Sequence, residues 1–152
     1  MSISAQPSDC RQPRELTAED VIVELVRAAG GTLRGKTRLF KAFYLAHLFF
    51  WERHGRFLTR HAIVHMPNGP GIDDAEDLFS RLQGFGRLRV TSERNGPFPE
   101  RVFLLGFTES AVTALEGEET SAIREAVAFV DGKTAAELSA LTHELSVSWQ
   151  ET

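Results

Sequence analysis

Residues 36–53 read KTRLFKAFYLAHLFFWER and contain neither proline nor glycine. Successive residues of a helix turn by about 100°, so each side chain falls on a definite face. One broad apolar face consists of Leu39, Phe40, Phe43, Ala46, Phe50 and Trp51. The opposite side carries Leu45, Leu48 and Phe49 beside Arg38 and Lys41. A helix that is apolar on more than one side is usually buried, so this segment predicts the central helix of the domain.

The apolar residues on the outward side have a second interpretation. Leu45 and Phe49 are four residues apart, and Arg38 and Lys41 lie near them at the rim. Protein interfaces combine desolvated apolar anchors with a charged rim. We therefore predict a partner-binding surface formed by Arg38, Lys41, Leu45 and Phe49. The competing interpretation is that the acidic C-terminal helices cover Leu45 and Phe49 within the monomer.

The composition is that of an ordinary globular chain. Its 152 residues suit one domain, and its hydrophobic fraction of 42% and charged fraction of 25% are typical. No apolar run reaches the roughly 18 residues of a membrane span, and the polar N-terminus lacks the apolar core of a signal peptide. We expect a flexible leader over residues 1–15 and a single domain over residues 16–152, with no membrane partner. The single Cys10 allows no internal disulfide, which fits a reducing cytoplasm.

The charges are distributed unevenly along the chain. The net charge of −4 gives no general attraction to nucleic acid. Residues 27–61 nevertheless carry eight basic residues and one acid, whereas residues 109–152 carry nine acids and two basic residues. Either the two segments attract each other within the fold, or they offer a basic face and an acidic face to partners of opposite charge.

Three threonines are predicted to begin helices. Thr17 and Asp20 have the spacing of a capping box, and apolar residues follow at helical intervals. Thr108 is predicted to cap a later helix, with Phe107 packing as an apolar staple beside it. Thr134 opens a second capping-box pattern near the C-terminus.

The middle of the chain predicts a strand, a turn, a short helix and a hairpin. Residues 59–66 fit a strand, residues 67–71 a tight turn and residues 72–82 a short helix. Residues 88–93 and 101–105 fit a β-hairpin whose two prolines prevent regular pairing in its long tip. The predicted fold class is α+β, mainly α, with five to six helices and a small β-hairpin.

The order of a helix, a turn, a short helix and a hairpin also resembles a winged helix-turn-helix. Four arginines would line its wing, at Arg87, Arg89, Arg94 and Arg101. The helix in the recognition position, however, begins with the acids Asp73, Asp74, Glu76 and Asp77. Phosphate would repel these carboxylates where a recognition helix normally meets DNA. A DNA-binding transcriptional regulator is therefore the alternative function, with nucleic acid a disfavoured partner.

The sequence offers no recognisable motif for catalysis or metal binding. It has no GxSxG, P-loop, HExxH or cysteine pair. His61 and His65 would lie about 13 Å apart along a strand, which is too far to share a metal ion. His47 lies among phenylalanines of its own helix, which is typical of a core histidine with hydrogen-bonded ring nitrogens. We expect no enzymatic activity, no cofactor and no metal.

Several stretches together resemble one family. They are Leu39–Leu48 (LFKAFYLAHL), Gly55–Thr59 (GRFLT), His65–Pro70 (HMPNGP), Ala136–Leu145 (AELSALTHEL) and Trp149. Their order and spacing resemble the Panacea domain over about three-quarters of the chain. That family includes SocA-like antitoxins, which act as adaptors that deliver a toxin to a protease. The resemblance implies a non-enzymatic domain that binds a protein partner, either a toxin or a protease substrate, and masks or delivers it.

Overall fold

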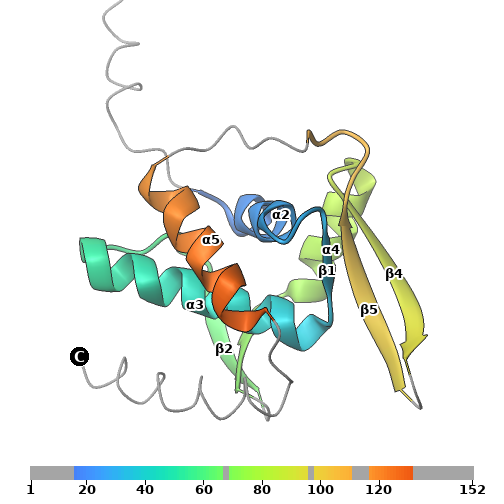
Figure 1. The fold of residues 1–152 in the computed structure, drawn as a ribbon, viewed down its shortest axis with the longest axis horizontal. Coiled ribbons are helices and arrows are strands. Elements are labelled where there is room, and N and C mark those ends of the chain that lie inside the picture. The colour runs from blue at the N-terminus through green and yellow to red at the C-terminus, as the bar shows by residue number, and fades with distance from the viewer. Residues whose placement is uncertain (1–15, 67–68, 96–97, 111–116, 132–152) are drawn as a thin grey trace, which may run out of the picture.

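The computed structural model describes residues 16–66, 69–95, 98–110 and 117–131 of the chain. Within these ranges, four helices and five strands follow one another (Figure 1). They are α2 (Ala18–Ala28), β1 (Thr32–Arg34), α3 (Lys36–His54), β2 (Ile63–Met66), β3 (Gly69–Ile72), α4 (Ala75–Gly84), β4 (Leu88–Asn95), β5 (Phe98–Leu105) and α5 (Glu118–Val130). The strands form two antiparallel sheets, one of three strands and one of two.

The architecture is α+β as predicted, but the prediction of five to six helices with one small hairpin is wrong. The described residues contain four helices, and their five strands form two sheets. A hairpin of β2 and β3, in place of a simple turn, separates α3 from α4. β1 adds a third strand to the β4–β5 pair. The predicted leader and the helix predicted from Thr134 lie outside the described residues.

α2 begins as its sequence predicts. The Thr17 side chain accepts a hydrogen bond from the backbone N–H of Asp20 (3.1 Å), and the Asp20 carboxylate accepts one from the N–H of Thr17 (3.3 Å). This capping box satisfies two of the donors that every helix start leaves open. The buried residues of α2 are Ala18, Val21, Ile22, Val23, Leu25 and Val26. The helix is thus both capped and held by its apolar face.

α3 is the central helix, as its apolar faces predict. Eleven of its 19 residues are buried, including a continuous run over residues 39–48. α5 crosses α3 and α2 packs beside it (Figure 1). Gly55 ends the helix in a left-handed conformation, with φ of 68°. No helix within the described ranges is long and apolar enough to cross a membrane.

β5 is the middle strand of the three-stranded sheet, between β1 and β4. The β4–β5 ladder pairs Leu88 with Leu105 at one end and Arg94 with Pro99 near the other. The strands therefore run further than predicted, and Pro99 does not prevent pairing. β1 pairs only with residues 102–104. Among the described strands, only β4 therefore pairs with β5 at Pro99. A proline is tolerated at such an edge position, because no second strand needs its missing N–H.

The segment between α3 and α4 departs from its prediction at both ends. The strand begins at Ile63, four residues later than predicted, and Ile63 pairs with Ile72 across the β2–β3 ladder. Ile72 is therefore a strand residue, and α4 begins only at Ala75. Asp74 precedes that helix with φ of 56°, a left-handed conformation that aspartate adopts more readily than most residues.

Candidate partner-binding surfaces

The structure does not bring the four predicted partner-binding residues together on an open surface. Lys41 and Leu45 are buried, with 2% and 0% of their surface exposed. Phe49 is half-buried, and its ring packs edge-to-face on Phe129 of α5 with centroids 6.1 Å apart. Arg38 is half-buried as well. Burial also lowers the pKa of the Lys41 ammonium, because a charge loses hydration there.

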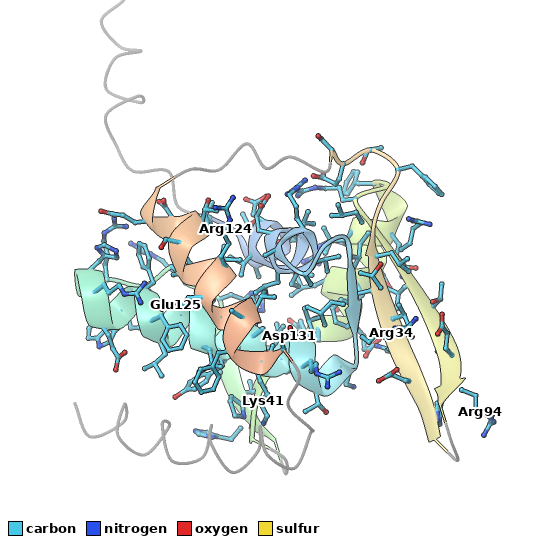
Figure 2. The ribbon with its side chains drawn as sticks, in the orientation of Figure 1. Arg34, Lys41, Arg94, Arg124, Glu125 and Asp131 are labelled. Carbon is cyan, nitrogen blue, oxygen red and sulfur yellow. The ribbon has the colours of Figure 1, made fainter. Side chains whose placement is uncertain are left out.

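Arg38 instead lines a cleft of about 390 Å³ beside the start of α3. Three arginines from three elements line this cleft, namely Arg34 of β1, Arg38 of α3 and Arg124 of α5. The other lining residues are Ala28, Ala29, Thr32, Leu33, Val127, Ala128, Val130 and Asp131. Figure 2 labels Arg124 on the upper half of α5, Asp131 at its lower end and Arg34 beside it. We call this space the arginine cleft.

The residues that line the arginine cleft carry a net positive charge. It holds three guanidinium groups and one carboxylate, that of Asp131. Arg34 donates a hydrogen bond to Glu93 (2.7 Å) and lies 3.9 Å from Glu100. The hydrogen bond to Glu93 raises the pKa of the Arg34 guanidinium, so it stays charged. Arg124 forms no ion pair with any residue that the structure describes, and its side chain is exposed.

A second surface feature lies where α4 meets β4 and where β5 ends. Phe85 and Phe107 are 74% and 85% exposed, far more than is usual for large apolar side chains. The guanidinium of Arg89 lies 4.5 Å from the centroid of the Phe107 ring, a cation–π arrangement. We call Phe85, Phe107 and Arg89 the aromatic corner. The sequence prediction did not single it out, although Gly84, Gly86 and Gly106 flank these phenylalanines and could have marked the turns.

Glycine is required where the two turns of the aromatic corner cross. A Cβ atom at Gly106 would lie 2.0 Å from the carbonyl oxygen of Gly86, which is closer than atoms can approach. The backbone N–H of Gly106 donates to the carbonyl of Arg87 (2.9 Å), and that of Thr108 donates to Gly86 (3.0 Å). These contacts fix the turns that carry Phe85 and Phe107.

Two expectations about the residues that follow β5 are wrong. Residues 107–109 form a turn and a bend, so no helix begins directly after Thr108. The Thr108 hydroxyl donates to the carbonyl of Gly86 (2.7 Å), where an N-cap would accept a backbone N–H. Phe107 is exposed and does not act as an apolar staple.

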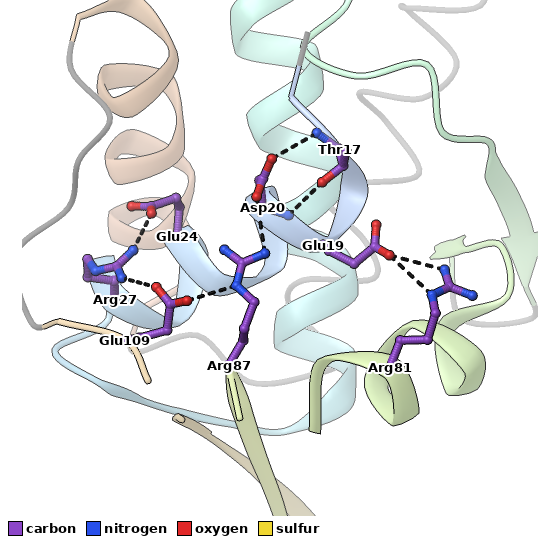
Figure 3. Close-up of polar contacts among 8 residues, drawn as sticks. All are labelled: Thr17, Glu19, Asp20, Glu24, Arg27, Arg81, Arg87 and Glu109. Atoms are coloured by element: carbon purple, nitrogen blue, oxygen red, sulfur yellow. Dashed lines mark hydrogen bonds and ion pairs between the residues drawn. The ribbon is translucent and has the colours of Figure 1, made fainter. Parts of the chain in front are cut away.

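An ion-pair network links α2 to Arg87 and Glu109, which lie close in sequence to the aromatic corner (Figure 3). Glu109 accepts hydrogen bonds from Arg27 of α2 (2.6 Å) and from Arg87 of the turn before β4 (2.8 Å). Arg87 also donates to Asp20 (3.2 Å), and Arg27 pairs with Glu24. Burial alone would raise the pKa of Glu109, but the bonds from Arg87 and Arg27 outweigh it and hold that pKa below its usual range. Through Arg27 and Glu109, the basic and acidic segments thus attract each other within the fold.

His47 is a core histidine, as predicted. It is 1% exposed, with Nδ1 2.8 Å from the carbonyl of Phe43 and Nε2 2.7 Å from the hydroxyl of Thr59. A carbonyl can only accept, so Nδ1 carries the proton and Nε2 accepts from Thr59. In the part of the chain that the structure describes, no three His, Cys, Asp or Glu side chains gather as they would around a metal ion.

Comparison with known proteins agrees with the resemblance noted from the sequence. The family model described as "Antitoxin SocA-like, Panacea domain" matches residues 39–150, which is well over half of the chain. The matched stretch begins in the buried part of α3 and includes both sheets' hairpins and α5. No curated protein and no solved structure matches the chain. On the strength of the family match, this chain belongs to the SocA-like antitoxin family with the Panacea domain.

Proposed function

We propose that this chain acts in the cytoplasm as the antitoxin of a toxin–antitoxin pair. It binds a protein toxin and neutralises it, either by masking its active surface or by delivering it to a protease. Membership in the SocA-like antitoxin family supports the antitoxin role. The observation that carries the binding role is the aromatic corner, because it presents two large exposed apolar side chains on turns whose backbone is held by hydrogen bonds. This mechanism is non-enzymatic and assigns no catalytic residue.

The aromatic corner has the properties of an interface anchor. Burying one phenylalanine side chain contributes about 1.5–3 kcal/mol, and a few aromatic anchors dominate most interfaces. The backbone bonds at Gly106 and Thr108 already fix the turns, so a partner pays little to order them. Arg89 adds a charge at the rim, next to Phe107. A partner with an apolar pocket and an acidic rim fits this surface.

The predicted surface on α3 stays a second proposal for partner contact. Arg38 and Phe49 have some exposed area, whereas Lys41 and Leu45 become accessible only if the packing around α3 opens. Because Phe49 packs on Phe129, we expect Phe49→Asp to lower the melting temperature. Lost toxin binding with an unchanged melting temperature would instead support the α3 surface.

The alternative of a DNA-binding regulator is disfavoured by the pairing of the hairpin arginines. Arg101 donates two hydrogen bonds to the carboxylate of Glu76, at 2.8 and 2.9 Å. These bonds lower the pKa of Glu76, which stays ionised. Arg87 is engaged by Asp20 and Glu109. Arginines neutralised in this way offer less to phosphate, whose contacts dominate affinity for DNA.

Co-expression tests the proposed function. The protein encoded by the adjacent gene is induced alone, together with this chain, and together with the Phe85→Ser/Phe107→Ser double variant. We expect growth arrest in the first case, normal growth in the second and arrest again in the third. The matched control is Phe57→Ser, because Phe57 is also an exposed phenylalanine, at 54%, but lies after α3. If the Phe85→Ser/Phe107→Ser variant restored growth as well as Phe57→Ser does, the proposed role of the aromatic corner would be wrong.

The half-life of the toxin distinguishes masking from delivery. Pulse-chase labelling is done with and without this chain, in hosts that have or lack their ATP-dependent proteases. Masking predicts an unchanged half-life, and delivery predicts a shorter half-life only where the protease is present. An adjacent protein that is harmless on its own would contradict the antitoxin role.

A further inference from the structure

We propose that the arginine cleft binds an acidic segment of the protein partner, with one carboxylate at Arg124 and an aliphatic side chain beside it. This proposal rests on the proposed function, since it names a second part of the same partner. It concerns a site separate from the aromatic corner, because none of the residues that line the cleft belongs to that corner.

The shape of the arginine cleft suits an extended chain. Arg124, Val127, Ala128 and Asp131 line it from α5, and their spacing of three and four residues places them along one face of the helix. At a rise of 1.5 Å per residue, this face is about 10 Å long. An extended peptide rises about 3.3 Å per residue, so the face matches roughly three residues.

The charges determine which side chains such a segment needs. Arg124 lies on the upper half of α5, whereas Arg34 lies beyond the other end of the helix, near Asp131 (Figure 2). Arg124 lines the cleft with an exposed side chain and has no acidic partner among the described residues. Arg34 is already paired with Glu93 and lies 3.9 Å from Glu100, so it offers less to a ligand than Arg124 does. A carboxylate near Arg124 would therefore complement the cleft best.

The floor between the arginines is apolar, which distinguishes a peptide from other anions. Ala28 and Ala29 are half-buried and Ala128 is exposed, and they line the cleft together with the buried Leu33, Val127 and Val130. A phosphate or another small anion would gain nothing from this floor. Nucleic acid would meet the net charge of −4 of the whole chain. An acidic segment with one aliphatic residue satisfies both the arginines and the floor.

Selection from a phage-displayed library of random decapeptides tests this inference with the intact chain as bait. We expect the enriched peptides to carry an acidic residue close to an aliphatic one. The best peptide is then synthesised with a fluorescent label, and its affinity is measured by anisotropy. Arg124→Glu should weaken binding at least about tenfold. Arg94→Glu makes the same change in net charge at the far end of β4 and should change the affinity less than about twofold (Figure 2).

A charge exchange sharpens the test. The acids of the peptide are then replaced by lysine. This lysine peptide should bind the Arg124→Glu variant more tightly than it binds the unsubstituted chain. No enrichment over bare resin, enriched peptides without acids, or equal losses for Arg124→Glu and Arg94→Glu would each overturn the proposal. The Phe85→Ser/Phe107→Ser variant should still bind the peptide, so a failure of the cleft and a failure of the antitoxin role give different results.

Discussion

Removing the imidazole of His47 should remove a pH dependence that this residue imposes on stability. Burial lowers the pKa of His47 from 6.5 to about 4, although the hydrogen bond to the carbonyl of Phe43 favours the protonated form. The nearby His61 lowers the pKa further. A shift of this size corresponds to about 3 kcal/mol between the folded and unfolded states.

The sign follows from which state binds the proton first. Above pH 6.5 the imidazole of His47 is neutral in both states, and its full contribution to stability is present. Between pH 6.5 and 4 the unfolded chain binds a proton that the folded chain does not, so stability falls as the pH falls. By pH 4.5 the expected loss from this residue is about 2 kcal/mol.

Urea unfolding between pH 7.5 and 4.5 measures this loss. His47→Gln should show a shallower fall in the free energy of unfolding than the unsubstituted chain, by about 2 kcal/mol over this range. His65→Gln is the matched control for loss of an imidazole, because His65 is exposed. NMR titration of the His47 ring should give a pKa below 5. Equal slopes for His47→Gln and the unsubstituted chain would refute a buried, neutral His47.

Three further predictions concern stability. Gly106→Ala should destabilise the fold by about 1–3 kcal/mol in urea unfolding, since its Cβ would collide with the carbonyl of Gly86. Gly84→Ala, where a Cβ meets nothing within 4 Å, should be neutral or stabilising, and equal effects at both glycines would contradict the crossing of the turns. Phe43→Ala should cost about 3–5 kcal/mol because Phe43 is fully buried, and a melting temperature lowered by only a degree would count against a central α3. Thr17→Ala should cost about 1 kcal/mol through loss of its cap, visible as a lower urea midpoint; an unchanged midpoint would argue against the capping box.

The fold could be predicted from the sequence where the signal is local. The capping box of Thr17 and the apolar faces of α3 depend on neighbours in the chain, and both are present. β1 was missed because three residues, of which only Leu33 is buried, are too few to show a period. Its stability comes from pairing with β5, some 70 residues away along the chain. The pairing of Pro99 could not be predicted for the same reason. Whether a strand position needs the N–H that proline lacks depends on how far β1 extends along β5.

The candidate surfaces depend even more on tertiary packing. The outward side of α3 carries Leu45 and Lys41, and no local pattern says whether another element covers them. The buried residues of α5, which include Val127 and Val130, follow one another at helical spacing. The arginine cleft could not be predicted, because Arg34 and Arg124 are 90 residues apart in the sequence and line one cleft only because α5 packs on α2 and α3.

The most direct test of the antitoxin account is the affinity between this chain and the protein encoded beside it. Isothermal titration calorimetry with both purified proteins should show saturable binding to the unsubstituted chain and to Phe57→Ser. The Phe85→Ser/Phe107→Ser variant, with an unchanged melting temperature, should bind at least about tenfold more weakly. Absence of binding to the unsubstituted chain, or equal affinities for all three proteins, would contradict the account.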